Sequence, residues 1–164
     1  MREIIVIAHN IRSSHNVGSI IRTCEGLGVD RLILSGYSPF LKSKNDPRLP
    51  HIANKVDSAI RKTALGAEKY LAWSYSQDIF GEIEKLKSLG FTIAGLEQTP
   101  GSIGLDKFKR PGKLALILGN ELTGIEPEIL AVCDTVIEIP MMGQKESFNV
   151  VQAAAMALYA LTSQ

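Results

Sequence analysis

The run LALIL at residues 114–118 is apolar at every position, and it constrains the fold more than any other segment of the chain. A strand that faces water on one side alternates apolar and polar residues, whereas a strand covered on both faces needs no polar side. LALIL therefore predicts a parallel strand with helices packed against both faces of its sheet. Other apolar runs predict further strands at residues 3–8, 31–36, 70–75, 91–96 and 135–140.

Longer segments with helical spacing of apolar residues alternate with these strands. They span residues 16–28, 53–67, 77–89, 125–133 and 149–162. The alternation predicts the α/β class, with a mostly parallel sheet flanked by helices. A chain of 164 residues with no visible linker is expected to form a single domain over residues 1–164.

Several classes of protein do not fit the sequence. No stretch approaches the ~18 consecutive apolar residues of a membrane span, and the N-terminal segment turns polar too soon for a signal peptide. Cys24 and Cys133 are isolated, and the three histidines show no metal-ligand spacing. We therefore expect a cytoplasmic protein with no membrane segment and no bound metal.

The charges are distributed unevenly along the chain. Residues 1–62 hold ten Lys and Arg against five Asp and Glu, whereas residues 114–164 hold one against six. Clustered Lys and Arg gain affinity for polyanions by releasing counterions, so a basic N-terminal portion favours a partner such as RNA. A solvated charged surface is the alternative. Residues 36–55 form a long predicted loop, and loops of that length are usually functional or mobile.

In open α/β sheets, ligands bind at the carboxyl ends of the strands, so the segments leaving the strands are the first candidates for a site. Three of them are rich in glycine and small polar residues: AGLEQTPGSIG, ILGNELTGIEPE and IPMMGQKESFN. The glycines of GNELTG (119–124) have P-loop spacing, but Ile125 occupies the position of the phosphate-binding lysine. These glycines allow either close approach to a bulky ligand or simply a tight turn.

The first predicted helix carries polar residues away from its apolar face. That face consists of Val17, Ile20, Cys24 and Leu27. Arg22 lies off this stripe and leans toward Gly18, because helical side chains point toward the N-terminus. We expect open space over Gly18 in which Arg22 and backbone N–H groups could bind a phosphate. A surface arginine beside a capping Asn16 is the alternative.

The last two loops supply further polar candidates. Glu126 and Glu128 are explained as residues that start a helix, but Glu121 precedes the turn and is either a solvated carboxylate or a site residue. Asn149 with Gln152 matches a capping box. The helix that follows is apolar on nearly every face, so it is expected to be buried by its own fold or by a second copy of the chain. We expect a homodimer that uses this helix.

Three segments, taken in order, resemble the motifs of one enzyme family. HNIRSSHNVGSIIRTCEGLG, ILGNELTGI and IPMMGQKESFNVVQAAAMALY are similar to the three motifs of the SpoU (TrmH) branch of the SPOUT RNA methyltransferases. The resemblance covers almost the whole chain. It implies a deep trefoil knot near the C-terminus, with S-adenosylmethionine bound there largely by loop backbone. The cofactor contacts it implies are Gly95, Leu96, Gly119, Ile139, Met141, Ser147 and Phe148.

The implied reaction is the transfer of a methyl group from S-adenosylmethionine to a ribose 2′-hydroxyl of RNA, with transfer RNA favoured and no metal required. The resemblance implies a site completed across a homodimer. The catalytic set it implies is Asn16, Arg22, Glu121, Ser147 and Asn149. An arginine with a pKa above ~12 is a poor base, so we expect Arg22 to orient the ribose and leave the proton acceptor open.

Many members of the family that the motifs resemble carry an N-terminal RNA-binding extension. We expect none here, so RNA recognition is expected to fall to the basic front portion. The candidate RNA contacts are Arg12, Lys42, Lys44, Arg48, Lys55, Arg61 and Lys62. Three alternatives stay open: the same chemistry on ribosomal RNA, base methylation, and an RNA-binding or S-adenosylmethionine-binding protein without catalysis. The presence of all five implied catalytic residues argues against the last of these.

Overall fold

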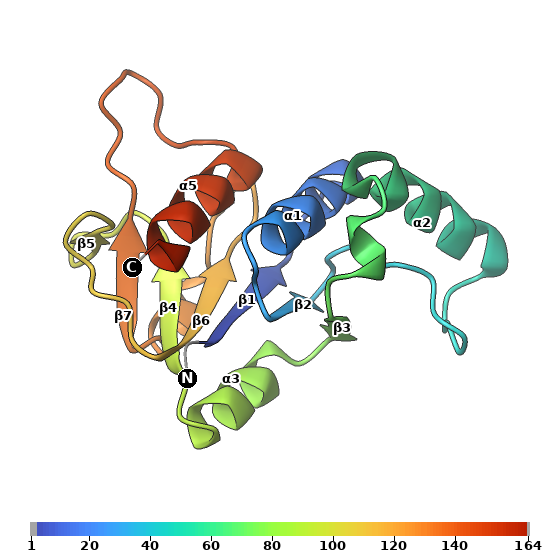
Figure 1. Cartoon of the computed structure of the whole chain (residues 1–164), viewed down its shortest axis with the longest axis horizontal. Helices are drawn as coiled ribbons and strands as arrows, with labels where there is room; N and C mark the ends of the chain where they lie inside the picture. Colours follow the sequence, from blue (N-terminus) through green and yellow to red (C-terminus); the bar gives the residue numbers. More distant parts are fainter. Residues whose placement is uncertain (1–2, 164) are drawn as a thin grey trace.

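The computed structural model describes residues 3–163, and within them a seven-stranded sheet forms the centre of the molecule (Figure 1). All pairings among these strands are parallel, and their order is β3-β2-β1-β6-β4-β7-β5. The strands are β1 (Glu3–His9), β2 (Arg31–Ser35), β3 (Trp73–Ser76), β4 (Thr92–Leu96), β5 (Ile103–Gly104), β6 (Lys113–Leu118) and β7 (Thr135–Glu138).

Helices cover both faces of the sheet. They are α1 (Ser14–Gly26), α2 (Pro50–Ala64), α3 (Ile79–Ser88), α4 (Pro127–Leu130) and α5 (Val150–Thr162), with a 3₁₀ turn η1 (Ala67–Lys69). In Figure 1, α1, α2 and α5 lie on one side of the sheet and α3 lies on the other. The predicted α/β class and parallel sheet are confirmed. The short strand β5 was not predicted, because two residues give no periodic pattern. The knot that the resemblance implies stays a prediction.

The strand β6 has the two-sided burial that its apolar sequence predicts. Leu114, Leu116 and Leu118 pack into a core formed with α1 and α5. Ala115 and Ile117 point to the opposite face and pack into the core formed with α3 and α4. Burying a Leu or Ile side chain contributes about 1.5–3 kcal/mol, so this strand stabilises both layers at once.

The helix α1 begins two residues earlier than predicted, because Ser13 caps it. The Ser13 hydroxyl accepts a hydrogen bond from the Asn16 backbone N–H at 3.2 Å. This satisfies one of the N–H groups that a helix start leaves without a partner. The Asn16 side chain is therefore not needed as the cap and is available for another contact.

The prediction of open space over Gly18 is wrong. Gly18 is buried, and a Cβ built on it would collide with the Ile60 carbonyl oxygen and the Thr63 hydroxyl of α2. The same hydroxyl donates a hydrogen bond across the contact to the His15 carbonyl oxygen at 2.8 Å. The missing side chain of Gly18 thus serves the close packing of α1 against α2 rather than a phosphate site.

Residues 3–163 contain neither a helix suited to span a membrane nor a cluster of metal-ligating side chains. No helix in this part of the chain is both long and apolar enough to cross a lipid bilayer. Within the same residues, no group of three or more His, Cys, Asp and Glu side chains could hold a metal ion.

We expect Gly18→Ala to lower the free energy of unfolding by roughly 1–3 kcal/mol, because the new methyl group forces α1 away from α2. The measurement is the urea unfolding midpoint. Gly26→Ala, in the same helix, is the matched control: nothing lies within 4 Å of its Cβ position, so we expect no loss, or a gain of up to about 1 kcal/mol. Equal behaviour of the two variants would contradict the packing role of Gly18.

Candidate active site

A cavity of about 320 Å³ opens at the carboxyl ends of β4, β6 and β7. Its walls come from the segments that leave these three strands and from the first turn of α5. The three loops singled out in the sequence therefore meet at one place, at the sheet edge where ligands bind in parallel α/β proteins.

Five of the seven residues expected to contact a cofactor line this cavity: Leu96, Gly119, Ile139, Ser147 and Phe148. Gly95 and Met141 do not. The Cβ position of Gly95 faces the side chains of Leu130 and Ile125, at 3.2 and 3.3 Å, so its small size serves packing beneath the sheet edge. Met141 lies in the mostly exposed loop between β7 and α5.

The GNELTG loop is a tight turn that also forms a wall of the cavity. The backbone N–H groups of Asn120 and Gly124 each donate to the other's carbonyl oxygen at 3.0 Å. The Asn120 side-chain oxygen accepts from the Leu122 and Thr123 N–H groups at 2.8 and 3.0 Å. A Cβ on Gly119 would collide with the Gly124 backbone. The glycine spacing thus reflects a closely folded turn, and this turn presents its backbone to the cavity.

Glu121 joins the cavity wall to the start of α1. Its carboxylate accepts hydrogen bonds from the Arg12 N–H at 2.8 Å, the Ser13 N–H at 3.2 Å and the Asn16 side-chain amide at 2.8 Å. Burial alone would raise the pKa of Glu121, but the donated hydrogen bonds outweigh it and hold the pKa below its ordinary value. Glu121 is therefore not simply a solvated loop carboxylate, and it fixes the Asn16 amide beside the cavity.

The other expected catalytic residues are placed differently. Ser147 lies in the cavity wall. Asn149 caps α5, since its side-chain oxygen accepts from the Val151 N–H at 2.8 Å, as the capping pattern predicts. Arg22 is exposed on α1 and does not line the cavity, and no partner of its side chain is found among residues 3–163. The structure thus places Glu121 and Ser147 in the cavity wall and bonds Asn16 to Glu121, but it leaves Arg22 outside the cavity.

Sequence reasoning missed Glu97, which also lines the cavity. One of its carboxylate oxygens accepts from the Ile125 N–H at 3.0 Å, and the other accepts from the Gln98 N–H at 2.9 Å. Glu97 therefore ties the end of β4 to the segment after β6. Glu97 directly follows a predicted strand, and this position could have identified it as a candidate site residue, as it did for Glu121.

A second missed group links the ends of β1, β2 and β6. The Asn120 amide donates to the Asn10 carbonyl oxygen at 2.9 Å and to the Tyr37 hydroxyl at 2.7 Å. The Asn10 side chain accepts from the Tyr37 N–H at 3.1 Å and donates to Glu126 at 2.6 Å. Glu126 is thus more than the helix-start residue expected from the sequence. Its second oxygen lies 3.7 Å from His9 Nε2. Burial lowers the pKa of His9, against the opposing attraction of Glu126.

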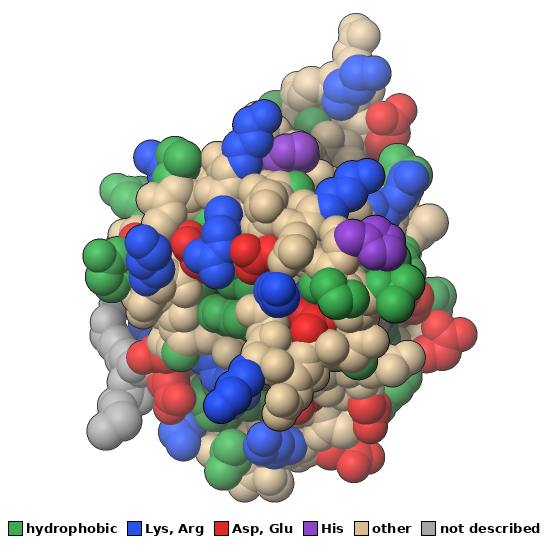
Figure 2. All heavy atoms as spheres, turned by 90° about the vertical axis from the view of Figure 1, so that its right-hand side faces the viewer, with side chains coloured by type: hydrophobic (Ala, Val, Ile, Leu, Met, Phe, Trp, Pro, Cys, Tyr) green, Lys and Arg blue, Asp and Glu red, His purple; other side chains and the backbone are tan. Residues whose placement is uncertain are grey.

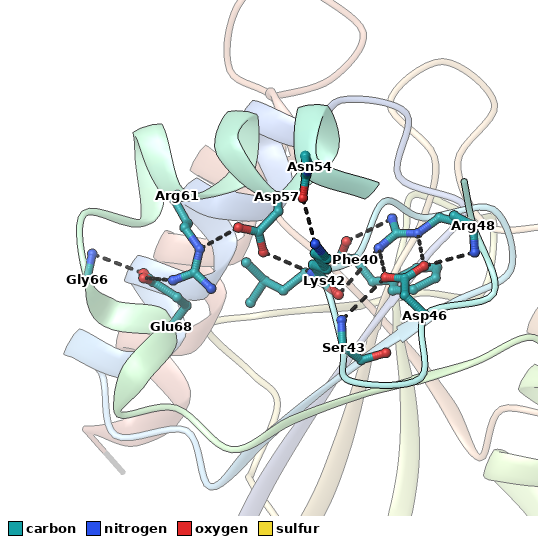
Figure 3. Close-up of polar contacts among 11 residues, drawn as sticks. Phe40, Lys42, Ser43, Asp46, Arg48, Asn54, Asp57, Arg61, Gly66 and Glu68 are labelled. Atoms are coloured by element: carbon teal, nitrogen blue, oxygen red, sulfur yellow. Dashed lines mark hydrogen bonds and ion pairs between the residues drawn. The ribbon is translucent and has the colours of Figure 1, made fainter. Parts of the chain in front are cut away.

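Three of the expected RNA contacts are already paired within the chain (Figure 3). Arg48 binds the Asp46 carboxylate at 2.6 Å and lies 3.7 Å over the Phe40 ring. Its guanidinium holds the pKa of Asp46 far below the usual range. Arg61 pairs with Asp57 and Glu68 at 2.6 and 2.7 Å. The Arg48 contacts thus close the 36–49 loop on itself, and the contact between Arg61 and Glu68 fastens η1 to α2.

Lys42 is the third paired residue, because its ammonium donates to the Asn54 side chain at 2.8 Å. The remaining four are exposed and have no side-chain partner among the residues that the structure describes: Arg12, Lys44, Lys55 and Lys62. Figure 2 shows Lys and Arg side chains scattered over the face that includes α2, with Asp and Glu side chains between them. Pairing therefore reduces the basic character that the residue counts suggest.

Comparison with known proteins agrees with the resemblance of the motifs. The model of the SpoU rRNA Methylase family matches residues 3–159. A tRNA (guanosine(18)-2′-O)-methyltransferase of Aquifex aeolicus is 30% identical over 161 residues, which cover 96% of this chain and 68% of that protein. Other curated relatives are longer, and the chain spans between 9% and 64% of their length.

Solved structures share the fold. The A. aeolicus TrmH/SpoU tRNA modifying enzyme superposes with a TM-score of 0.81 at 26% identity, over 100% of this chain and 76% of that one. AviRb from Streptomyces viridochromogenes, solved in complex with the cofactor AdoMet, superposes with a TM-score of 0.81 over 99% of this chain and 57% of its own. At 23% identity, the second likeness concerns the fold alone.

Replacing Glu121 by Gln tests the carboxylate that joins the loop to α1. We expect Glu121→Gln to lower the free energy of unfolding at neutral pH by roughly 1–3 kcal/mol, as for other hydrogen bonds to charged groups. A carboxyl whose pKa is lowered by folding stabilises above its ordinary pKa, and that contribution is lost as the pH falls through the lowered value. The difference between the two proteins should therefore shrink in acid.

The measurement is urea unfolding of both proteins at a series of pH values from 7 down to about 3. Glu84→Gln is the control, because Glu84 is exposed and has no hydrogen bond or ion pair within residues 3–163. A difference between wild type and Glu121→Gln that stays constant across the series would contradict this role for Glu121.

Proposed function

Because the chain belongs to the SpoU rRNA methylase family, we propose that it transfers a methyl group from S-adenosylmethionine to a ribose 2′-hydroxyl of RNA. The observation that supports this most directly is the cavity at the ends of β4, β6 and β7, which the second and third of the motif-like segments line. Glu121 connects it to the first of these segments through Asn16. Its volume of about 320 Å³ lies within the range of small-molecule sites.

The residues of the cavity fit S-adenosylmethionine in charge and polarity. Its lining holds four glutamates and, among the described residues, no Lys or Arg: Glu97, Glu121, Glu138 and Glu146. A cofactor with a sulfonium and an ammonium group complements such a wall. Leu96, Ile139 and Phe148 offer apolar surface for its adenine ring and carbon chain, beside the folded backbone of the 119–124 turn.

Bound S-adenosylmethionine would supply an activated methyl group, so the protein chiefly has to align the ribose hydroxyl and exclude water. We propose that Asn16, held by Glu121, and Ser147 orient the reacting groups at the cavity. Arg22 would bind the phosphate or ribose rather than accept the hydroxyl proton, since its guanidinium stays charged. Gly95, Met141 and Asn149 keep the positions described above. That Gly95, Met141 and Asn149 contact the cofactor or the substrate remains a proposal.

We further propose that the active unit is a homodimer. One face of α5 packs into the core, but Met156 and Tyr159 on the same helix are 37% and 67% exposed. An unpartnered apolar face of this kind favours a second copy of the chain. Arg22 lies outside the cavity of its own chain, so in this proposal the partner's surface would complete the site.

Transfer RNA is the proposed substrate, because the A. aeolicus relative is named for a transfer RNA modification. Ribosomal RNA is the alternative, since it appears in the description of the family. We propose that residues 1–164 act as one catalytic domain in the cytoplasm, in keeping with the free thiols of Cys24 and Cys133. No metal ion takes part in this proposal.

A methylation assay tests the reaction and the RNA class together. Purified protein and labelled S-adenosylmethionine are incubated with unmodified bulk transfer RNA and, separately, with ribosomal RNA. The digested products are then analysed by mass spectrometry. We expect a 2′-O-methylnucleoside from transfer RNA. A methylated base would point to base methylation, and cofactor binding without transfer to either RNA would point to a protein that binds without catalysing.

We expect Arg22→Ala to lower the rate of methyl transfer by about 10²–10³-fold, the usual effect of removing a positioned donor, while S-adenosylmethionine binding stays intact. Calorimetry and the methylation assay measure the two quantities. Unchanged turnover would overturn the role of Arg22.

Mixing two inactive variants tests how the site is shared. If Arg22 serves the partner's cavity, a mixed dimer of Arg22→Ala and Ser147→Ala contains one intact site and recovers activity. If both residues act within one chain, neither site is intact and the mixture stays inactive.

For RNA binding, we expect the triple substitution of Lys44, Lys55 and Lys62 by Gln to weaken affinity and to flatten its salt dependence. Each lost phosphate contact should lower the slope of log K against log salt by about 0.7–0.9. Filter binding at several salt concentrations measures both. The control is the same charge change at exposed lysines elsewhere: Lys85, Lys107 and Lys109. Equal slopes for the two triple variants would contradict this RNA surface.

A further inference from the structure

Tyr37 follows the end of β2 and combines an exposed ring with a fixed position. Tyr37 is 62% exposed, although burying a large aromatic ring would stabilise the fold. Its hydroxyl nevertheless accepts a 2.7 Å hydrogen bond from Asn120, and its backbone N–H donates to the Asn10 side chain at 3.1 Å. Both ends of the residue are thus held while the ring stays in contact with solvent.

The backbone around Tyr37 adopts conformations that are uncommon outside functional sites and turns. Asn10, which receives the Tyr37 N–H, has a φ of 54°, and Gly36 has a φ of 63°. A Cβ on Gly36 would collide with the Asn10 side chain. A non-glycine residue in this region of φ is strained, and such strain persists only where surrounding contacts hold it. Here Asn10 is held by the hydrogen bonds of its side chain with Tyr37 and Glu126.

Tyr37 is hydrogen-bonded to a residue of the cavity wall. Its partner Asn120 lines that cavity and holds the turn at Leu122 and Thr123. The next residue, Glu121, accepts the backbone N–H of Arg12, whose side chain is exposed. Tyr37, whose ring is exposed, and Arg12, whose side chain is exposed, are therefore hydrogen-bonded to two neighbouring residues of the cavity wall.

We propose that the Tyr37 ring is a stacking surface for a base of the RNA substrate, which positions the ribose at the mouth of the cavity. This inference rests on the proposed function and adds a substrate-positioning residue to it. Every nucleobase has a π-face, so stacking on tyrosine tolerates any base and suits an anchoring contact. The hydrogen bond at the hydroxyl fixes the ring before RNA arrives, which reduces the entropy lost on binding.

The occupied arginines support this location for an RNA contact. Arg48 and Arg61 are engaged by carboxylates of their own chain, so neither guanidinium is free to bind a phosphate without breaking an ion pair. Within residues 3–163, neither the Arg12 guanidinium nor the face of the Tyr37 ring has such a competing partner. A stacked base with a phosphate near Arg12 would use both.

The test compares Tyr37→Ala with Tyr37→Phe. Removing the ring should raise the KM for RNA by about 5- to 150-fold, the range that corresponds to the loss of one base–aromatic stack. Tyr37→Phe keeps the ring and should stay within about threefold of wild type. The affinity for S-adenosylmethionine, measured by calorimetry, should change by less than about threefold in both variants. The control is Tyr70→Ala, because Tyr70 is an 80% exposed tyrosine that directly follows η1.

Four outcomes would overturn the proposal. These are an unchanged KM for RNA in Tyr37→Ala, an equal loss in Tyr37→Phe, a parallel loss of S-adenosylmethionine affinity, and a change of oligomeric state in sedimentation. The last would mean that the ring packs against a second copy of the chain. Direct filter binding of unmodified bulk transfer RNA to the same proteins keeps the test separate from catalysis. If wild type transfers no methyl group, the proposed function fails, whereas the contribution of Tyr37 to RNA binding is still measured.

Discussion

The position of β6 between β1 and β4 is the constraint on which the rest of the site depends. Its five apolar residues are buried on both faces, so the strand cannot move to an edge of the sheet without exposing them. The loop that leaves β6 therefore meets the ends of both neighbours. Glu121 contacts Arg12 and Asn16 after β1, and Ile125 contacts Glu97 after β4.

The cavity is built from backbone turns that are held by short polar side chains. Asn120 folds its own loop and also contacts the ends of β1 and β2. Glu97 and Glu121 each accept backbone N–H groups from loops that start at other strands. Because the carboxylates satisfy these donors, the loops keep one arrangement without a large apolar core of their own. The same carboxylates give the cavity its acidic wall.

Much of the fold followed from periodicity, because local pattern and burial agree in the strands and longer helices. The cap of α5 by Asn149 also followed, since a cap depends on residues only two or three positions away. Gly18 shows where such reasoning fails. A glycine on a helix permits either open space or a close neighbour, and the neighbour here is α2, more than 40 residues later in the chain.

The sequence by itself determined the α/β class, the order of the elements and the three loops at the sheet edge, because these depend on apolar spacing and on parallel strands ending together. Tertiary structure decided which charges are free and which polar residues meet. Arg48 and Arg61 are paired within the chain, and Asn10 reaches Glu126 across 116 positions of sequence. Contacts over that distance leave no local pattern, so only the folded chain reveals them.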